Sequence, residues 1–354
     1  HLCMYSLLHF FAVLAQLVER LLAKQKAAGS RPAYRTNKIR FILFTCLIIL
    51  TSCGGGGSSN SSETNPNGSD QDVNLSTEIC SNTNRDGLFK CDLKHDNRDR
   101  FYYVYAPGNL DSNESIPVLF ALHGYGSSAL THLNYTNYFP IADTNNFIVV
   151  YPQGATTATL SSHWNVGGWT SKSTVKDIEF IDTIINLLKA KIQIDETRLY
   201  SSGMSNGGYM SYHLICNLSE RFAAIASVTG SMTNGTYNNC SPLHPMPVLQ
   251  IHGLQDFVVP YIGNSGSKSI PDVIDYWVNY NSCKLEPNQL IKYSNNFDLV
   301  IYDTYENCLN NVNVKLILHP EMDHTWPTLQ EYGVSASNEI WNFVSQYDLY
   351  GFIE

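Results

Sequence analysis

Residues 203–207 read Gly-Met-Ser-Asn-Gly and match the pattern G-x-S-x-G. Five positions with three of them fixed are a weak signal alone, so the neighbouring sequence decides what the motif means. A strand-like run precedes it and a helix-like run follows it, at 198–202 and 206–216. This context predicts a strained turn that presents the Ser205 hydroxyl as a nucleophile, with glycines where side chains would collide. The alternative is a glycine-rich turn without chemistry.

A serine nucleophile needs a base and a carboxylate, and their order along the chain narrows the choice. After a turn of this kind the order is serine, then Asp or Glu, then His. Asp256 follows an apolar run, and only His319 and His324 lie beyond it. We choose His324, because it lies in a loop whereas His319 ends a strand-like run. The predicted triad is therefore Ser205, Asp256 and His324, in which the carboxylate orients the imidazole and stabilises its charged form.

Backbone N–H groups near the serine could bind the negative charge that develops during acyl transfer. One candidate is the N–H of Asn206, the residue after the serine. The loop 122–126 (LHGYG) follows another apolar run and offers the second candidate, the N–H of Tyr125. We expect the ring of His123 only to pack and hydrogen-bond below this loop. Aromatic residues that we predict to line a substrate pocket are Trp164, Trp169 and Trp326.

Strand-like and helix-like runs alternate from about residue 100. The predicted strands are 100–106, 117–122, 147–151, 198–202, 223–228, 247–251 and 314–318. Helices are predicted at 174–191, 206–216, 270–280 and 338–347 from apolar residues at three- and four-residue spacing. Continuous apolar strands between helices predict an α/β fold with a mainly parallel sheet covered on both faces. The segment 153–173 is the predicted surface insertion over the site.

Charge argues against nucleic acid as a partner. The 354-residue chain has 22 Lys or Arg against 31 Asp or Glu, a formal net charge of −9. Because basic residues are concentrated before residue 54, the remainder is more acidic still. A phosphate backbone would be repelled by such a surface, and no basic stripe compensates for it.

Six of the nine cysteines lie after the leader region. None of them forms a C-x-x-C pair, so a zinc or redox site is not indicated. An even set in an exported chain predicts disulfides, and six cysteines allow 15 pairings. We favour neighbours in order, with buried free thiols as the alternative. The favoured pairs are Cys80–Cys91, Cys216–Cys240 and Cys283–Cys308.

The apolar run 41–50 is too short to span a bilayer but suits the core of a signal peptide. It ends in Leu-Thr-Ser-Cys, which resembles a bacterial lipobox. We therefore predict that 37–53 is a lipoprotein-type signal segment and that Cys53 is lipidated, with an ordinary signal peptide as the alternative. Gly54 after the cysteine implies export to the outer membrane. The Gly/Ser/Asn-rich segment 54–78 is predicted to be a flexible linker.

Residues 1–36 fit no part of an exported protein well. The string AQLVERLLAKQKAAGSRPAYR looks like the peptide that results when a tRNA gene is translated by mistake. We expect this stretch to be a spurious leader, with an amphipathic helix as the alternative, and exclude it from the reasoning on fold. The predicted catalytic domain is 79–354.

Several segments together resemble the extracellular polyhydroxybutyrate depolymerase and feruloyl esterase group of α/β hydrolases. They are LHGYG, YPQG, VKDIEFI, DETRLYSSGMSNGGYM, PVLQIHGLQDFVVPY, HTWP and the pair Cys283 and Cys308, over about 98–347. The resemblance implies an α/β-hydrolase fold, one catalytic domain and no metal or organic cofactor, and it supports the bridge Cys283–Cys308. Many relatives have a Cys where this chain has Tyr125, so one of their disulfides is missing here.

The expected function is that of a secreted serine carboxylic ester hydrolase acting through an acyl-enzyme. Feruloyl or acetyl esters of polysaccharides and aliphatic polyesters such as polyhydroxybutyrate are the substrates that the resemblance implies. We expect a monomer whose only membrane contact is the lipid at Cys53. An acyltransferase or peptidase on the same fold is one rival. The other rival is a surface binding protein without catalysis, against which the complete set of triad residues argues.

Overall fold

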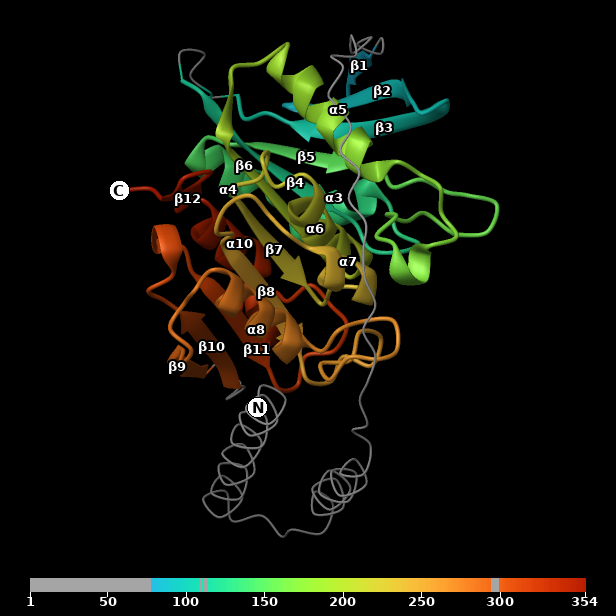
Figure 1. The fold of residues 1–354 in the computed structure, drawn as a ribbon. Coiled ribbons are helices and arrows are strands. Elements are labelled where there is room, and N and C mark those ends of the chain that lie inside the picture. Colours follow the sequence, from blue (N-terminus) through green and yellow to red (C-terminus); the bar gives the residue numbers. More distant parts are fainter. Residues whose placement is uncertain (1–77, 109, 111–113, 294–298) are drawn as a thin grey trace. The chain divides into compact units, whose positions relative to one another are not determined.

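One mixed sheet forms the centre of the described structure, with helices against its faces (Figure 1). The computed structural model describes residues 78–108, 110, 114–293 and 299–354. The predicted leader, the signal segment with Cys53, and the linker as far as residue 77 lie outside the described residues.

The strands are β1 (Ile79–Asn82), β2 (Leu88–His95), β3 (Arg98–Tyr105), β4 (Ile116–Leu122), β5 (Ile148–Pro152), β6 (Ile194–Met204), β7 (Ala224–Val228), β8 (Val248–Gly253), β9 (Asn288–Tyr293), β10 (Leu299–Tyr305) and β11 (Val314–His319). Their order across the sheet is β1-β2-β3-β5-β4-β6-β7-β8-β11-β10-β9. The six central strands from β5 to β11 are parallel, and the strands at both edges pair antiparallel. A small second sheet joins β12 (Tyr347–Asp348) to β13 (Gly351–Phe352).

The helices are α3 (Ala129–Thr136), α4 (Phe139–Asn145), α5 (Asp177–Lys189), α6 (Asn206–Asn217), α7 (Asn234–Asn239), α8 (Ile270–Tyr280), α9 (Leu329–Tyr332) and α10 (Ala336–Val344), with 3-10 turns η2 (Gly168–Thr170) and η3 (Leu309–Asn311). Figure 1 shows α6 and α8 in front of the sheet and α10 behind it. Strands β4, β5, β7 and β8 are buried along their whole lengths, because helices cover both of their faces.

The predicted α/β-hydrolase fold is confirmed, and each predicted strand and helix has a counterpart in the structure. The sequence analysis missed the strands β1, β2, β9 and β10. The two edge strands, β1 and β9, are exposed along all or nearly all of their lengths and lack a continuous apolar run, whereas β10 is mostly buried. The short helices α3 and α4 also escaped prediction, because fewer than three turns give little periodicity.

Three disulfides join the cysteines in the order favoured from the sequence. Cys80–Cys91 links opposed residues of β1 and β2. Cys216–Cys240 ties the end of α6 to the residue after α7, and Cys283–Cys308 closes the β9–β10 hairpin region. Within the described part of the chain, no helix has the length and apolar character needed to cross a membrane.

Candidate active site

Three strand ends meet at one edge of the sheet and carry the predicted triad. Strands β6, β7, β8 and β11 are parallel neighbours, so their carboxyl ends lie side by side. Met204 of β6 pairs with Val228, Val228 pairs with Ile251, and Ile251 pairs with Ile317. The residues that follow β6, β8 and β11 therefore leave the sheet at the same level. Ligand and catalytic sites of α/β sheets occur at this carboxyl edge.

Ser205 occupies the turn between β6 and α6 in a strained conformation, with φ 53° and ψ −120°. A side chain on Gly203 would place its Cβ 2.3 Å from the Gly207 carbonyl carbon. A Cβ on Gly207 would lie 2.0 Å from the Leu122 carbonyl oxygen at the end of β4. These distances show why glycine is needed on both sides of the serine. A serine with positive φ on such a turn is the arrangement that exposes its hydroxyl at the sheet edge.

The carboxylate of Asp256 accepts a hydrogen bond from Nδ1 of His324, with Nδ1 and Oδ2 2.8 Å apart. Its other oxygen accepts the N–H groups of Val258 and Val259 at 2.9 and 2.8 Å. Burial raises the pKa of Asp256, but the hydrogen bonds from His324 and Val259 and the nearby imidazoles outweigh burial and hold this pKa below its usual value. The carboxylate is thus ionised, and Nε2 of His324 can accept a proton.

His252, which the sequence analysis did not single out, supports this carboxylate from below. Its Nε2 lies 2.9 Å from the Val259 carbonyl and 3.7 Å from Oδ2 of Asp256, and Gln250 Nε2 lies 3.1 Å from its Nδ1. Burial lowers the pKa of His252 to about 4. The neutral ring therefore donates from Nε2 to Val259, accepts from Gln250, and fixes the turn that holds Asp256. Its position at the end of an apolar strand was the available signal.

The rejected alternative for the base, His319, ends β11 and is buried. Its Nδ1 accepts the N–H of Glu321 at 3.1 Å, and its ring meets that of Tyr332 edge-on. These contacts hold the start of the loop that carries His324. The choice of His324 as the residue facing Asp256 agrees with the observed hydrogen bond.

The two predicted oxyanion donors lie on segments that touch Ser205. A Cβ on Gly124 would lie 3.5 Å from Cβ of Ser205, so the loop after β4 packs directly against the serine. Asn206 is the first residue of α6. Among the described residues, neither the N–H of Tyr125 nor that of Asn206 is paired with an acceptor. Two free N–H groups flanking a serine form a site that can bind an oxyanion.

Parts of the chain are similar to known proteins. Residues 133–242 match the model of the prolyl oligopeptidase family. The chain is 29% identical over 258 residues to a bifunctional acetylxylan esterase/xylanase of Neocallimastix patriciarum, covering 71% of this chain and 34% of that protein. It is 28% identical over 224 residues to feruloyl esterase B of Piromyces equi, covering 60% of this chain and 40% of that protein. The chain thus spans less than half the length of either relative.

The S-formylglutathione hydrolase of Agrobacterium tumefaciens has a similar fold, with a TM-score of 0.50 and 13% identity over 75% of this chain and 98% of that one. This protein therefore has the α/β-hydrolase fold. Its similarity in sequence is to feruloyl and acetylxylan esterases.

Two of the three tryptophans predicted to line the substrate pocket are buried in the structure. Trp164 has no exposed surface, and Trp326 is 2% exposed. The indole of Trp326 donates to Oγ of Ser337 on α10 at 3.1 Å and packs edge-on against His132, so it joins α3 to α10. Both residues were predicted to line the pocket because aromatic rings suit acyl groups. In the structure, both rings pack between elements of the fold.

Trp169 is 40% exposed and fits the predicted pocket better. Its ring lies edge-on to those of Tyr125 and Tyr209, with centroids 6.0 and 5.7 Å apart. Tyr125 lies in the loop that touches Ser205, and Tyr209 lies one helical turn after Ser205 on α6. Phe257, directly after Asp256, is 84% exposed. Apolar side chains therefore flank the triad on both the oxyanion side and the acid side.

One group of side chains in the described part of the chain has metal-ligand proximity: Glu78, Cys80 and Cys91. The two cysteines are bonded to each other, so neither offers a thiolate. This group lies on the edge strands β1 and β2 and does not belong to the candidate active site.

Proposed function

We propose that this α/β hydrolase is a serine carboxylic ester hydrolase with Ser205, Asp256 and His324 as its triad and 79–354 as its catalytic domain. The observation that carries the proposal is the 2.8 Å hydrogen bond between His324 and Asp256, formed between loops that leave the sheet beside a strained Ser205. The similarity to esterases supports the same reading.

The reaction proceeds in two balanced steps. Oγ of Ser205 attacks the ester carbonyl carbon while Nε2 of His324 takes the hydroxyl proton, and the carbonyl oxygen becomes an oxyanion. The bond to the alcohol oxygen then breaks, His324 returns the proton to the departing alcohol, and an acyl-enzyme remains. Water repeats the sequence on the acyl-enzyme, which releases the acid and restores Ser205.

The N–H groups of Tyr125 and Asn206 bind the oxyanion in both steps. Such donors contribute because they are already oriented when the charge forms, and loss of one donor typically costs about 10²- to 10³-fold in kcat. Asp256 keeps Nδ1 of His324 protonated, so Nε2 is the nitrogen left to accept the serine proton.

For the acyl group we favour feruloyl or acetyl esters of polysaccharides. The relatives named above carry those activities in their names, and the exposed ring of Trp169 beside Tyr125 offers an aromatic contact. Aliphatic polyesters such as polyhydroxybutyrate are the second candidate, favoured by the exposed Phe257 next to Asp256.

A substrate panel with a chemical label tests the proposal. Methyl ferulate, acetylated xylan, short-chain nitrophenyl esters and a soluble polyester would be assayed for hydrolysis, alongside labelling of Ser205 by a fluorophosphonate. We expect turnover of at least one ester and one label per chain at Ser205. Labelling without hydrolysis, but with acyl transfer to an added amine or alcohol, would favour the acyltransferase rival. Neither labelling nor hydrolysis would favour the binding-protein rival.

We also propose that the protein is exported, lipid-anchored through Cys53 and monomeric. Three disulfides in the described residues support an oxidising compartment. A Cys53→Ser variant expressed with its leader should lose acylation and move from the membrane fraction to the soluble fraction, with esterase activity intact. A variant that stays in the membrane fraction would contradict the anchor.

A further inference from the structure

Trp164 connects the two segments that carry the oxyanion donors. Its backbone N–H donates to Oδ1 of Asn206 at 2.7 Å, and its carbonyl accepts Nδ2 of Asn206 at 3.1 Å. Its indole Nε1 donates to the carbonyl of His123 at 2.9 Å. One buried residue thus forms hydrogen bonds with the start of α6 through its backbone and with the loop after β4 through its side chain.

We propose that Trp164 is a positioning residue that sets the separation and direction of the N–H groups of Tyr125 and Asn206. The inference rests on the proposed function, since it assigns these groups as oxyanion donors. It also assigns a role to the insertion 153–173, which connects the start of α6 to the loop after β4.

The protonation of His123 explains how the insertion can influence the direction of the Tyr125 N–H. Nε2 of His123 accepts the backbone N–H of Gly154 at 2.9 Å, so the ring proton is on Nδ1, which donates to the Gly124 carbonyl at 2.8 Å. In a trans peptide the carbonyl and the following N–H point in opposite directions. With the Gly124 carbonyl held by the ring, the Tyr125 N–H is directed away from it. The indole of Trp164 donates to a second carbonyl of this loop, that of His123.

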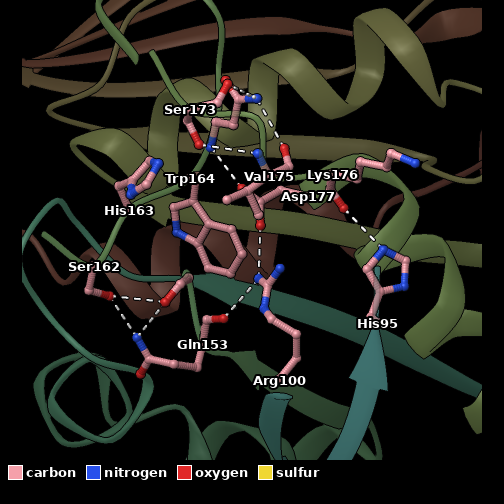
Figure 2. Close-up of polar contacts among 12 residues, drawn as sticks. His95, Arg100, Gln153, Ser162, His163, Trp164, Ser173, Val175, Lys176 and Asp177 are labelled. Carbon is pink, nitrogen blue, oxygen red and sulfur yellow. Dashed lines mark hydrogen bonds and ion pairs between the residues drawn. The ribbon is translucent and has the colours of Figure 1, made fainter. Parts of the chain in front are cut away.

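A buried ion pair holds the insertion 153–173 in place (Figure 2). Arg100 of β3 donates from Nη2 to Oδ1 of Asp177 at 2.8 Å, and the two side chains are 3% and 0% exposed. The other oxygen of Asp177 accepts the N–H of Asn165 at 2.8 Å, one residue after Trp164. Arg100 also donates to the carbonyl of Gln153 at 3.0 Å. The insertion is therefore pinned at residues 153 and 165, on either side of the segment that leads to Trp164.

The decisive experiment removes the indole N–H while keeping an aromatic ring. Trp164→Phe should lower kcat by about 10- to 100-fold, because small displacements of catalytic groups are costly, with KM within about twofold. The second-order rate constant for fluorophosphonate labelling should fall by the same factor, since the phosphonyl oxygen occupies the oxyanion site.

Trp277→Phe is the matched control. Trp277 lies on α8, is fully buried, and its indole N–H has no partner among the described residues. The control makes the same change in ring and volume, so kcat, KM and the labelling rate should stay near wild type. Equal losses in the two variants would mean that Trp164 acts only through packing, and would overturn the inference.

A second pair keeps the test decisive if Trp164→Phe fails to fold. The amide of Asn281 makes the same two contacts with Met246 that Asn206 makes with Trp164, at 2.8 and 2.7 Å, and both amides are fully buried. Asn206→Ala should lower kcat and the labelling rate by about tenfold or more, whereas Asn281→Ala should change neither, at a temperature where both are folded. Equal rates in this pair would overturn the inference.

These outcomes separate the inference from the proposed function. An active wild-type chain whose paired variants behave alike overturns only the role of Trp164. A wild-type chain that hydrolyses no ester and takes no fluorophosphonate overturns both.

Discussion

The two sides of Ser205 are built in different ways. On the acid side, the proposed reacting groups are the side chains of His324 and Asp256, which project from loops after β8 and β11. His324 keeps part of its side chain exposed, at 18%. On the oxyanion side, the proposed donors are backbone N–H groups, and the residues that hold them are almost entirely buried. Trp164, Asn206 and the pair Arg100–Asp177 form that support.

The difference follows from what each group must do. A side chain that moves a proton needs one good partner and access to the substrate, which the single bond to Asp256 provides. A backbone N–H cannot turn by itself, so its direction depends on the surrounding segments being held. The acid side should therefore be sensitive to changes of the reacting residues themselves, and the oxyanion side to changes of residues that never touch substrate.

The largest effect should come from the nucleophile. Ser205→Ala should lower kcat for any hydrolysed ester by several orders of magnitude, on the order of 10⁶, because the triad acts as a unit. Residual catalysis by the oxyanion donors should remain, roughly 10³-fold over water. Ester hydrolysis and circular dichroism of the purified variant check this. Activity within about tenfold of wild type in a folded variant would refute the assignment of Ser205.

The two histidines after β8 provide a test of the acid side. His324→Ala should reduce kcat nearly as much as loss of the serine, since the proposed base is then missing and the triad acts as a unit. His319→Ala should keep activity, because that ring contacts Glu321 and Tyr332 and is not the proposed base. Steady-state kinetics of both variants decide the matter. The reverse pattern would mean that the base is His319.

The contrast between the two sides also explains how much the sequence could predict. The triad positions follow from residue types, chain order and strand ends, and the strands that bring them together were visible as apolar runs. The support on the oxyanion side was not visible. Trp164 was predicted to line the pocket, because a sequence does not show which backbone groups an indole will meet.

Long separations hide the rest of that support. Arg100 and Asp177 lie 77 residues apart and meet only because β3 and the start of α5 are neighbours in the fold. An aspartate at the start of a helix is ordinary, and nothing in the string VKDIEFI distinguishes a buried charge from a solvated one. The role of His252 could not be predicted either, because it depends on the contacts of its ring with Gln250 and Val259.

The next largest effect should be on stability, from the ion pair that anchors the oxyanion side. Asp177→Asn leaves the Arg100 charge buried without its partner, which should lower the free energy of unfolding by about 3–5 kcal/mol. Asp99→Asn is the control, because its pair with Lys94 is exposed, at 75% and 88%, and exposed pairs contribute about 0–1 kcal/mol. Urea unfolding of both variants measures the difference. Equal losses would contradict the importance of the buried pair.

A smaller loss should follow removal of a disulfide far from the triad. Cys283 and Cys308 are 25 residues apart, and opening a loop of that length should lower the free energy of unfolding by roughly 3 kcal/mol in the chain-entropy model. The double variant Cys283→Ser and Cys308→Ser should keep kcat, because neither residue contacts the active site. Urea unfolding and a non-reduced peptide digest check both points. Free thiols at both positions in the wild-type digest would contradict the bridge.

The smallest expected effect concerns His132, a buried histidine on α3 that packs against Trp326. Burial lowers the pKa of His132 to about 3, whereas in the unfolded chain it titrates near about 6.5. Between these values the unfolded chain binds the extra proton, so this stability is present at neutral pH and is lost as the pH falls through the window. His132→Phe keeps an aromatic ring and removes the proton site. Its loss of unfolding free energy between pH 7 and 4.5 should be smaller than that of wild type by up to about 2.7 kcal/mol. Urea unfolding of both proteins at the two pH values measures this, and identical pH dependence would show that His132 does not stay neutral in the folded protein.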